Sequence, residues 1–191
     1  EAFLQPRTDP PLVFPQIGSG IIQNSKTKDW QNTKILFDQG SDECWITESF
    51  AKDMNCKPLG NWKGFLTTIN GRERIDRPAV EFTLFNFELQ QTMKIQALVS
   101  GSKVINKKSR IPDKKFKELC SAFSLKTEQI DDTEGPCHIL IGLKHQSIQT
   151  SRSQSFKSDK FPEVGVYRSP VMKYTIFVGQ DTVRPQEITF P

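Results

Sequence analysis

The sequence predicts a mainly β protein, a closed barrel or a sandwich with two or three short helices. Three observations lead to this prediction: several short runs of β-branched and aromatic residues, an Asn-Gly dipeptide between two of them, and two short stretches with helical spacing of apolar residues. The chain has 191 residues, the length of one ordinary domain, and its 36% hydrophobic content suffices for a core.

The N-terminal part predicts an extended arm followed by paired strands. Four prolines fix φ and remove amide donors within residues 1–15, so these are expected to form an extended arm. Segments 12–17 and 19–24 are expected as strands, with a turn or bulge at Gly18 and Gly20 between them.

A further strand, 34–37, stops abruptly in a polar turn, 38–41. After this turn, Ile46, Phe50 and Met54 recur at i, i+4 and i+8. This spacing is typical of a short amphipathic helix.

The centre of the chain predicts a protruding hairpin. Asn70-Gly71 lies between the strand-like runs 64–69 and 72–75, and this dipeptide favours a type I′ turn, in which both central residues have positive φ. Apolar and polar residues alternate over 80–85 and 93–99, which predicts two half-buried strands.

The C-terminal half begins with a basic segment, 101–117. Pro112 is placed to begin a helix, and apolar residues at i, i+3, i+4 and i+7 give that helix one buried stripe: Phe116, Leu119, Cys120 and Phe123. We interpret the lysines as a solvated face because no aromatic residues interleave them, with nucleic-acid binding as the less favoured alternative. The remaining expectations are a buried strand at 137–142, a last strand at 174–178, a loop at 150–160 and a tail at 181–191.

Charge and cysteine content limit the classes of function. The net charge of +4 permits an anionic partner without arguing for one, and no stretch approaches the ~18 apolar residues of a membrane helix. The four cysteines lack C-x-x-C spacing, so we expect buried free thiols rather than a metal site, with two disulfides as an alternative. These thiols favour a reducing intracellular compartment, cytoplasmic or nuclear. Because the chain begins with Glu, we expect it to be a domain of a longer protein.

The chemistry of the chain is concentrated in the turn Asp38, Gln39, Gly40, Ser41. An Asp-x-Gly turn is common by itself, since Asp hydrogen-bonds its own backbone and Gly supplies free φ. A second apolar segment, 139–142, ends in Gly about a hundred residues later. The pair of segments, with a hairpin between them, favours a catalytic interpretation.

The stretch ILFDQGSDECWITESFAKDMNCK, residues 35–57, resembles an aspartic protease of the retroviral type, closest to the protease-like domain of Bel/Pao retrotransposons. The resemblance continues through 111–112, 137–148 and 169–179, in matching order. It implies a single-lobed, closed retropepsin-like barrel over residues 16–180.

The resemblance also implies roles for individual residues. Asp38 would be catalytic, in an active-site turn that continues through Gln39, Gly40, Ser41 and Asp42. Thr68, Ile69, Asn70 and Gly71 would form the tip of a flap, and Ile139, Ile141 and Gly142 would line the substrate groove.

Such an enzyme holds a water between two carboxylates that share one proton, without a metal or other cofactor. The chain contains one Asp-x-Gly, so the second carboxylate must come from another copy. We therefore expect a homodimer that cleaves a peptide or polyprotein substrate, with no membrane or nucleic-acid partner.

Three positions depart from the family pattern. Gln39 replaces the Thr or Ser whose hydroxyl bonds across the dimer axis, which leaves a catalytically impaired dimerisation or peptide-binding module as the alternative. Leu143 replaces an Arg, so Asp42 is expected to pair with Lys144 or to lie in solvent. His138 replaces an acidic residue, and is either a surface histidine at a strand end or a histidine with a tuned pKa.

Overall fold

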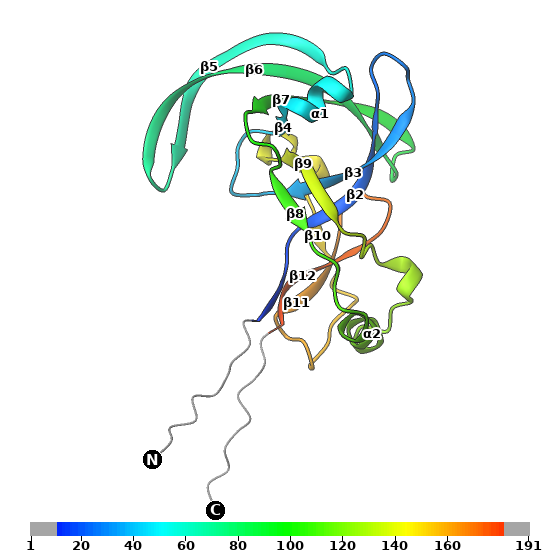
Figure 1. Ribbon diagram of the computed structural model, residues 1–191. Helices are drawn as coiled ribbons and strands as arrows, with labels where there is room; N and C mark the ends of the chain where they lie inside the picture. Colours follow the sequence, from blue (N-terminus) through cyan, green and yellow to red (C-terminus); the bar gives the residue numbers. More distant parts are fainter. Residues whose placement is uncertain (1–10, 182–191) are drawn as a thin grey trace, which may run out of the picture.

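The protein, described here by a computed structural model over residues 11–181, is built around a closed β-barrel. The barrel strands follow the order β2-β3-β9-β4-β7-β6, and β6 returns to pair with β2 (Figure 1). The prediction of a mainly β, closed-barrel protein is confirmed. The strands are β1 (Leu12–Phe14), β2 (Ile17–Gln23), β3 (Trp30–Phe37), β4 (Trp45–Thr47), β5 (Lys57–Thr68), β6 (Gly71–Asn86), β7 (Gln91–Ser100), β8 (Asn106–Lys108), β9 (Gly135–Ile141), β10 (Ser151–Arg152), β11 (Val164–Arg168) and β12 (Ile176–Asp181). The helices are α1 (Glu48–Asp53), α2 (Asp113–Ala122) and the short 3-10 helices η1 (Thr127–Gln129) and η2 (Leu143–Ile148).

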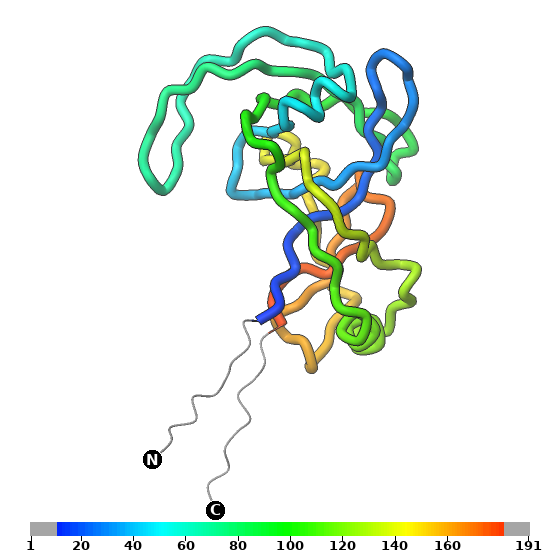
Figure 2. Tube along the Cα trace, viewed as in Figure 1, coloured from blue at the N-terminus to red at the C-terminus, as the bar shows by residue number. Residues whose placement is uncertain are grey.

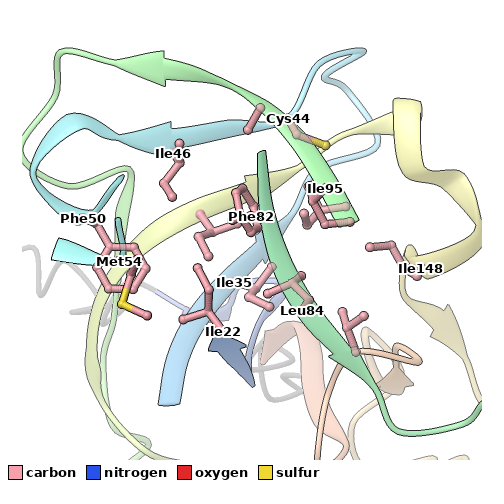
Figure 3. Close-up of a cluster of buried hydrophobic side chains, with 14 of the residues drawn as sticks. Ile22, Ile35, Cys44, Ile46, Phe50, Met54, Phe82, Leu84, Ile95 and Ile148 are labelled. Carbon is pink, nitrogen blue, oxygen red and sulfur yellow. The ribbon is translucent and has the colours of Figure 1, made fainter. Parts of the chain in front are cut away.

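Alternating apolar residues of the barrel strands fill its interior. Phe37 at the end of β3 and Phe82 in β6 are almost wholly buried, and Ile35, Ile46 and Ile95 have no exposed surface. Figure 3 shows Ile35, Ile46, Phe82 and Ile95 converging from the strands, with Phe50 added from α1. Burying each large apolar side chain contributes about 1.5–3 kcal/mol, so this cluster is the main source of stability.

A second, smaller sheet lies below the barrel in Figure 1, with strand order β1-β12-β11-β10. Helix α2 begins directly after Pro112, as the sequence predicts, and buries Leu119 and Cys120. Phe123, at the end of α2, packs against Phe177 of β12 with ring centroids 5.5 Å apart. This sheet thus has its own apolar cluster, separate from the barrel core.

The predicted hairpin is present and very long, because β5 pairs with β6 from Lys57 to Thr68 (Figure 1). Its turn is one residue earlier than expected. Thr68 pairs with Gly71, so Ile69 and Asn70 are the two turn residues. Neither of them has positive φ, whereas Gly71, the first residue of β6, does. The type I′ prediction is therefore wrong: the Thr68 hydroxyl accepts a hydrogen bond from the Asn70 amide, which closes the turn without left-handed Asn.

The expected break at Gly18 and Gly20 is also wrong. Strand β2 runs through both glycines and pairs with β3 over its whole length. A Cβ at Gly18 would lie 2.5 Å from the Met172 side chain, and one at Gly20 would lie 2.6 Å from the Val171 carbonyl oxygen. The lack of a Cβ at these glycines therefore allows Val171 and Met172, before β12, to pack closely against β2, and the strand is not bent there.

The thiols of the protein form no disulfide among the described residues. All four cysteines are free, and burial raises the pKa of the Cys44, Cys56 and Cys137 thiols to about 11. Within residues 11–181, no helix has the length and apolar character to cross a membrane. Residues 1–10 of the expected arm and 182–191 of the expected tail lie outside the described residues, while Leu12–Phe14 forms β1.

A buried polar cluster connects the barrel to the segment before β9. Lys108 donates hydrogen bonds to the carbonyl oxygens of Ile17 and Asp131, at 2.8 and 3.1 Å. The Lys34 ammonium lies 3.6 Å from the Asp131 carboxylate, whose side chain is 2% exposed. Burial raises the pKa of Asp131, but Lys108 and the Thr133 hydrogen bonds outweigh this effect and hold it at about 2. Burial lowers the pKa of Lys108 to about 8, against the opposing charge of Asp131.

We expect Lys108 to make stability increase with pH above 8. Its pKa is about 8 when folded and 10.5 when unfolded, so between these values the unfolded chain binds more protons and raising the pH favours the folded state. Relative to Lys108→Met, the wild type should gain up to about 3 kcal/mol of unfolding free energy across this window. Urea unfolding at pH 7 to 10.5 measures the difference in unfolding free energy between the wild type and Lys108→Met. The cysteines also titrate in this range, but both proteins contain them, so their contribution cancels in the difference. Lys107→Met, at an exposed neighbour, is the control, and a wild-type curve parallel to Lys108→Met would contradict the assignment.

Candidate active site

The Asp38 turn is fixed by backbone and side-chain hydrogen bonds at the end of β3. The Asp38 amide donates to the Ile141 carbonyl oxygen at 3.0 Å, and the Gly40 amide donates to Asp38 Oδ1 at 2.8 Å. A Cβ on Gly40 would lie 3.1 Å from that oxygen, so glycine allows the tight turn. Asp38 is half-buried, whereas Gln39 and Gly40 are exposed.

Gly142 lies directly beneath the continuation of this turn. Strand β9 runs parallel to β3, with Phe37 opposite Ile141, and brings Gly142 under the loop that follows Asp38. A Cβ on Gly142 would lie 2.3 Å from the Glu43 carbonyl oxygen and 2.5 Å from that of Ser41. The two sequence-predicted segments therefore meet, and their contact requires glycine.

The groove assigned to Ile139 and Ile141 is wrong. Both side chains have no exposed surface, because they point into the barrel core from β9. Gly142 is also buried, under the Ser41–Glu43 backbone. These three residues support the turn from below and cannot line a groove.

Asp42 is exposed, and its expected partner Lys144 pairs with another residue. The Lys144 ammonium lies 3.5 Å from Glu43, while its amide donates to the Asp42 carbonyl oxygen at 2.9 Å. The Lys144 alternative is wrong for the Asp42 carboxylate, and the solvent alternative is confirmed.

The hairpin β5–β6 reaches toward the same end of the molecule as the Asp38 turn. In Figure 2 the hairpin tip extends beyond the side of the barrel that carries the turn after β3. A hollow of about 270 Å³ brings Glu43 and Lys144 together with Leu59 and Trp62 of β5. Ile69, at the tip, is fully exposed. The base of the hairpin thus adjoins the turn, whereas Thr68, Ile69, Asn70 and Gly71 project into solvent.

Sequence reasoning missed Gln149, which lies near the turn, and misplaced His138. Gln149, after η2, donates through Nε2 to the Ile141 carbonyl oxygen at 2.8 Å and lines a polar hollow together with Gln39. His138 is not at a strand end: it lies within β9, stacks on Phe50 with ring centroids 5.0 Å apart, and bonds Thr47 Oγ1 at 2.9 Å. Burial lowers the pKa of His138, with Asp53 partly opposing it. No local motif marks Gln149, because its role depends on a tertiary contact.

Comparison of the chain with family models, curated proteins and solved structures finds no match. Among residues 11–181, no three His, Cys, Asp or Glu side chains are grouped so that they could hold a metal ion.

We expect Gly142→Ala to destabilise the protein, because the new methyl group would meet two backbone carbonyl oxygens that cannot move cheaply. Overpacking of this kind costs about 1–3 kcal/mol, measurable by urea unfolding. Gly101→Ala is the matched control: its Cβ would have Arg77 Nη1 as nearest neighbour, 3.8 Å away, and should change stability by less than about 0.5 kcal/mol. Equal stability of the two variants would contradict the close approach.

Proposed function

We propose that this chain is a retropepsin-like aspartic endopeptidase domain of retrotransposon origin, similar to those of Bel/Pao elements, and that it acts as a homodimer. The observation that carries the proposal is the arrangement of Asp38 and Gly142. An Asp-x-Gly turn ends one barrel strand and rests on an apolar-Gly segment that ends the parallel neighbour. Such a crossing of an Asp-x-Gly turn and an apolar-Gly segment is what the resemblance to retroviral-type aspartic proteases implies.

The proposed reaction is hydrolysis of a peptide bond by water held between two Asp38 carboxylates. Like charges so close cannot both ionise, so the pair shares one proton: the ionised member takes a proton from water, and the protonated member polarises the scissile carbonyl. Among the described residues, Oδ1 accepts the Gly40 amide and Oδ2 accepts no protein hydrogen bond, so Oδ2 is available to water. The substrate would be a peptide or polyprotein, covered by the β5–β6 hairpin acting as a flap.

Gln39 supports a second candidate, a catalytically impaired domain that dimerises or binds peptides. Its side chain is longer than Thr or Ser and is exposed rather than packed in the turn. Without a short hydroxyl at the axis, the two carboxylates would be less firmly held together. For either candidate, the free thiols favour an intracellular location, cytoplasmic or nuclear.

We expect weak peptide cleavage between pH 4 and 7 that Asp38→Asn abolishes, because the amide cannot serve as the base. A peptide library with mass-spectrometric detection measures this, and Asp159→Asn, at an exposed carboxylate in the loop after β10, should retain the activity. Gln39→Thr should raise the rate by restoring the hydroxyl. If neither the wild type nor Gln39→Thr cleaves any peptide, the binding-module candidate replaces the enzyme.

We expect homodimers in sedimentation at micromolar concentration, since one chain supplies one Asp-x-Gly. Gln39→Thr should tighten the dimer about tenfold, because it supplies the short hydroxyl that can bond across the axis. Gln154→Thr, at an exposed site, serves as the control. Strict monomers of both the wild type and Gln39→Thr would exclude the shared-carboxylate mechanism.

A further inference from the structure

The Ile141 carbonyl oxygen accepts two hydrogen bonds, one from the backbone of Asp38 and one from the side chain of Gln149. The Asp38 amide donates to it at 3.0 Å, and Gln149 Nε2 donates to it at 2.8 Å. Gln149 therefore fixes the acceptor on which the Asp38 backbone depends. No other side chain of the described residues donates to this oxygen.

Gln149 is itself held firmly. It follows η2, its amide donates to the Gln146 carbonyl oxygen at 3.1 Å, and the residue is 8% exposed. Its side chain can reach the Ile141 carbonyl oxygen because η2 folds the chain back immediately after Gly142. Because the Gln149 side chain is already buried and ordered, it loses little further conformational entropy when it donates to the Ile141 carbonyl oxygen.

The other end of the same carboxamide lacks a partner. Gln149 Oε1 is buried and accepts no hydrogen bond within residues 11–181, a state that costs about 1–3 kcal/mol if it persists. Gln149 lines a polar hollow of about 500 Å³ whose wall also includes Gln39, Leu143 and Arg168. Gln39 carries two N–H donors at the mouth of this hollow, and its side chain is exposed.

We propose that Gln149 is a positioning residue for Asp38, and that the Gln39 carboxamide docks in this hollow and donates to Gln149 Oε1. The positioning role has catalytic meaning only if the proposed function holds. Docking turns Gln39 away from the dimer axis and gives Gln149 Oε1 a hydrogen-bond donor; His145 Nε2, in η2, is a second buried atom without a partner among the described residues. Gln39 then acts within its own chain, through Gln149 and Ile141, on the Asp38 backbone.

Residue-resolved amide hydrogen exchange tests the positioning role. In Gln149→Met the Asp38 amide should exchange about three- to tenfold faster relative to Ile95, a core residue that reports global opening. Gln154→Met, at an exposed glutamine that does not line this hollow, should leave the Asp38 amide unchanged. An unchanged Asp38-to-Ile95 ratio in Gln149→Met would overturn the role.

A second variant gives a signature that simple packing would not produce. In Gln149→Glu a protonated carboxyl can donate to the Ile141 carbonyl oxygen, whereas an ionised carboxylate cannot. Protection of the Asp38 amide, corrected for intrinsic exchange, should therefore recover in this variant as the pH falls and the introduced carboxylate takes up a proton. A pH-independent loss of protection would contradict the hydrogen-bonding role.

The Gln39 contact is tested by a double-mutant cycle and, without any substitution, by NMR. Gln39→Met should speed Asp38 exchange in the wild type but not in Gln149→Met, and the wild type should show nuclear Overhauser contacts between the two carboxamides. Equal effects in both backgrounds, or absent contacts, would overturn the docking. These measurements use no substrate, so their failure is distinct from failure to detect Asp38-dependent cleavage.

Discussion

The close approach of Gly142 to the Ser41–Glu43 backbone determines the architecture of the candidate site. Two chain segments about a hundred residues apart meet there with no side chain between them. Any residue larger than glycine would push the turn away from β9 and break the bond from the Asp38 amide to the Ile141 carbonyl oxygen. The position of the Asp38 carboxylate thus depends on the absence of one methyl group.

The barrel makes this contact precise, because the parallel pairing of β3 with β9 sets the level at which both strands end. Phe37 and Ile141 are opposite one another and both point into the core, so a slip of one residue would expose one of them. The core packing therefore sets β3 and β9 to end at the same level, and this places the Asp38 turn directly over Gly142. The Lys34, Asp131 and Lys108 cluster secures the opposite end of the same region, where apolar packing is replaced by buried charges.

Local patterns in the sequence predict the elements but not the contacts between them. Alternation predicted β6 and β7, and the spacing of Phe116 to Phe123 predicted α2, since each pattern reflects one buried face. The Asp38 turn and the 139–142 segment were also identified, because each is a continuous motif. By contrast, the bond from Gln149 to Ile141 and the partner of Lys144 depend on side chains from different elements. The glycines of β2 were misjudged for the same reason, since what they accommodate is the distant Val171–Met172 segment.

The distal half of the hairpin β5–β6 extends away from the barrel and contributes little to the buried core. The second half of β6 supplies core residues such as Phe82 and Leu84, whereas in the distal half Ile75 alone is buried. Lengthening both strands by two residues at the tip would preserve which side chains face each way, and would leave the barrel packing untouched. Lengthening each by one residue would exchange the two faces beyond the insertion. The length of the β5–β6 hairpin can therefore change during evolution by two residues in each strand without any change in the barrel that carries it.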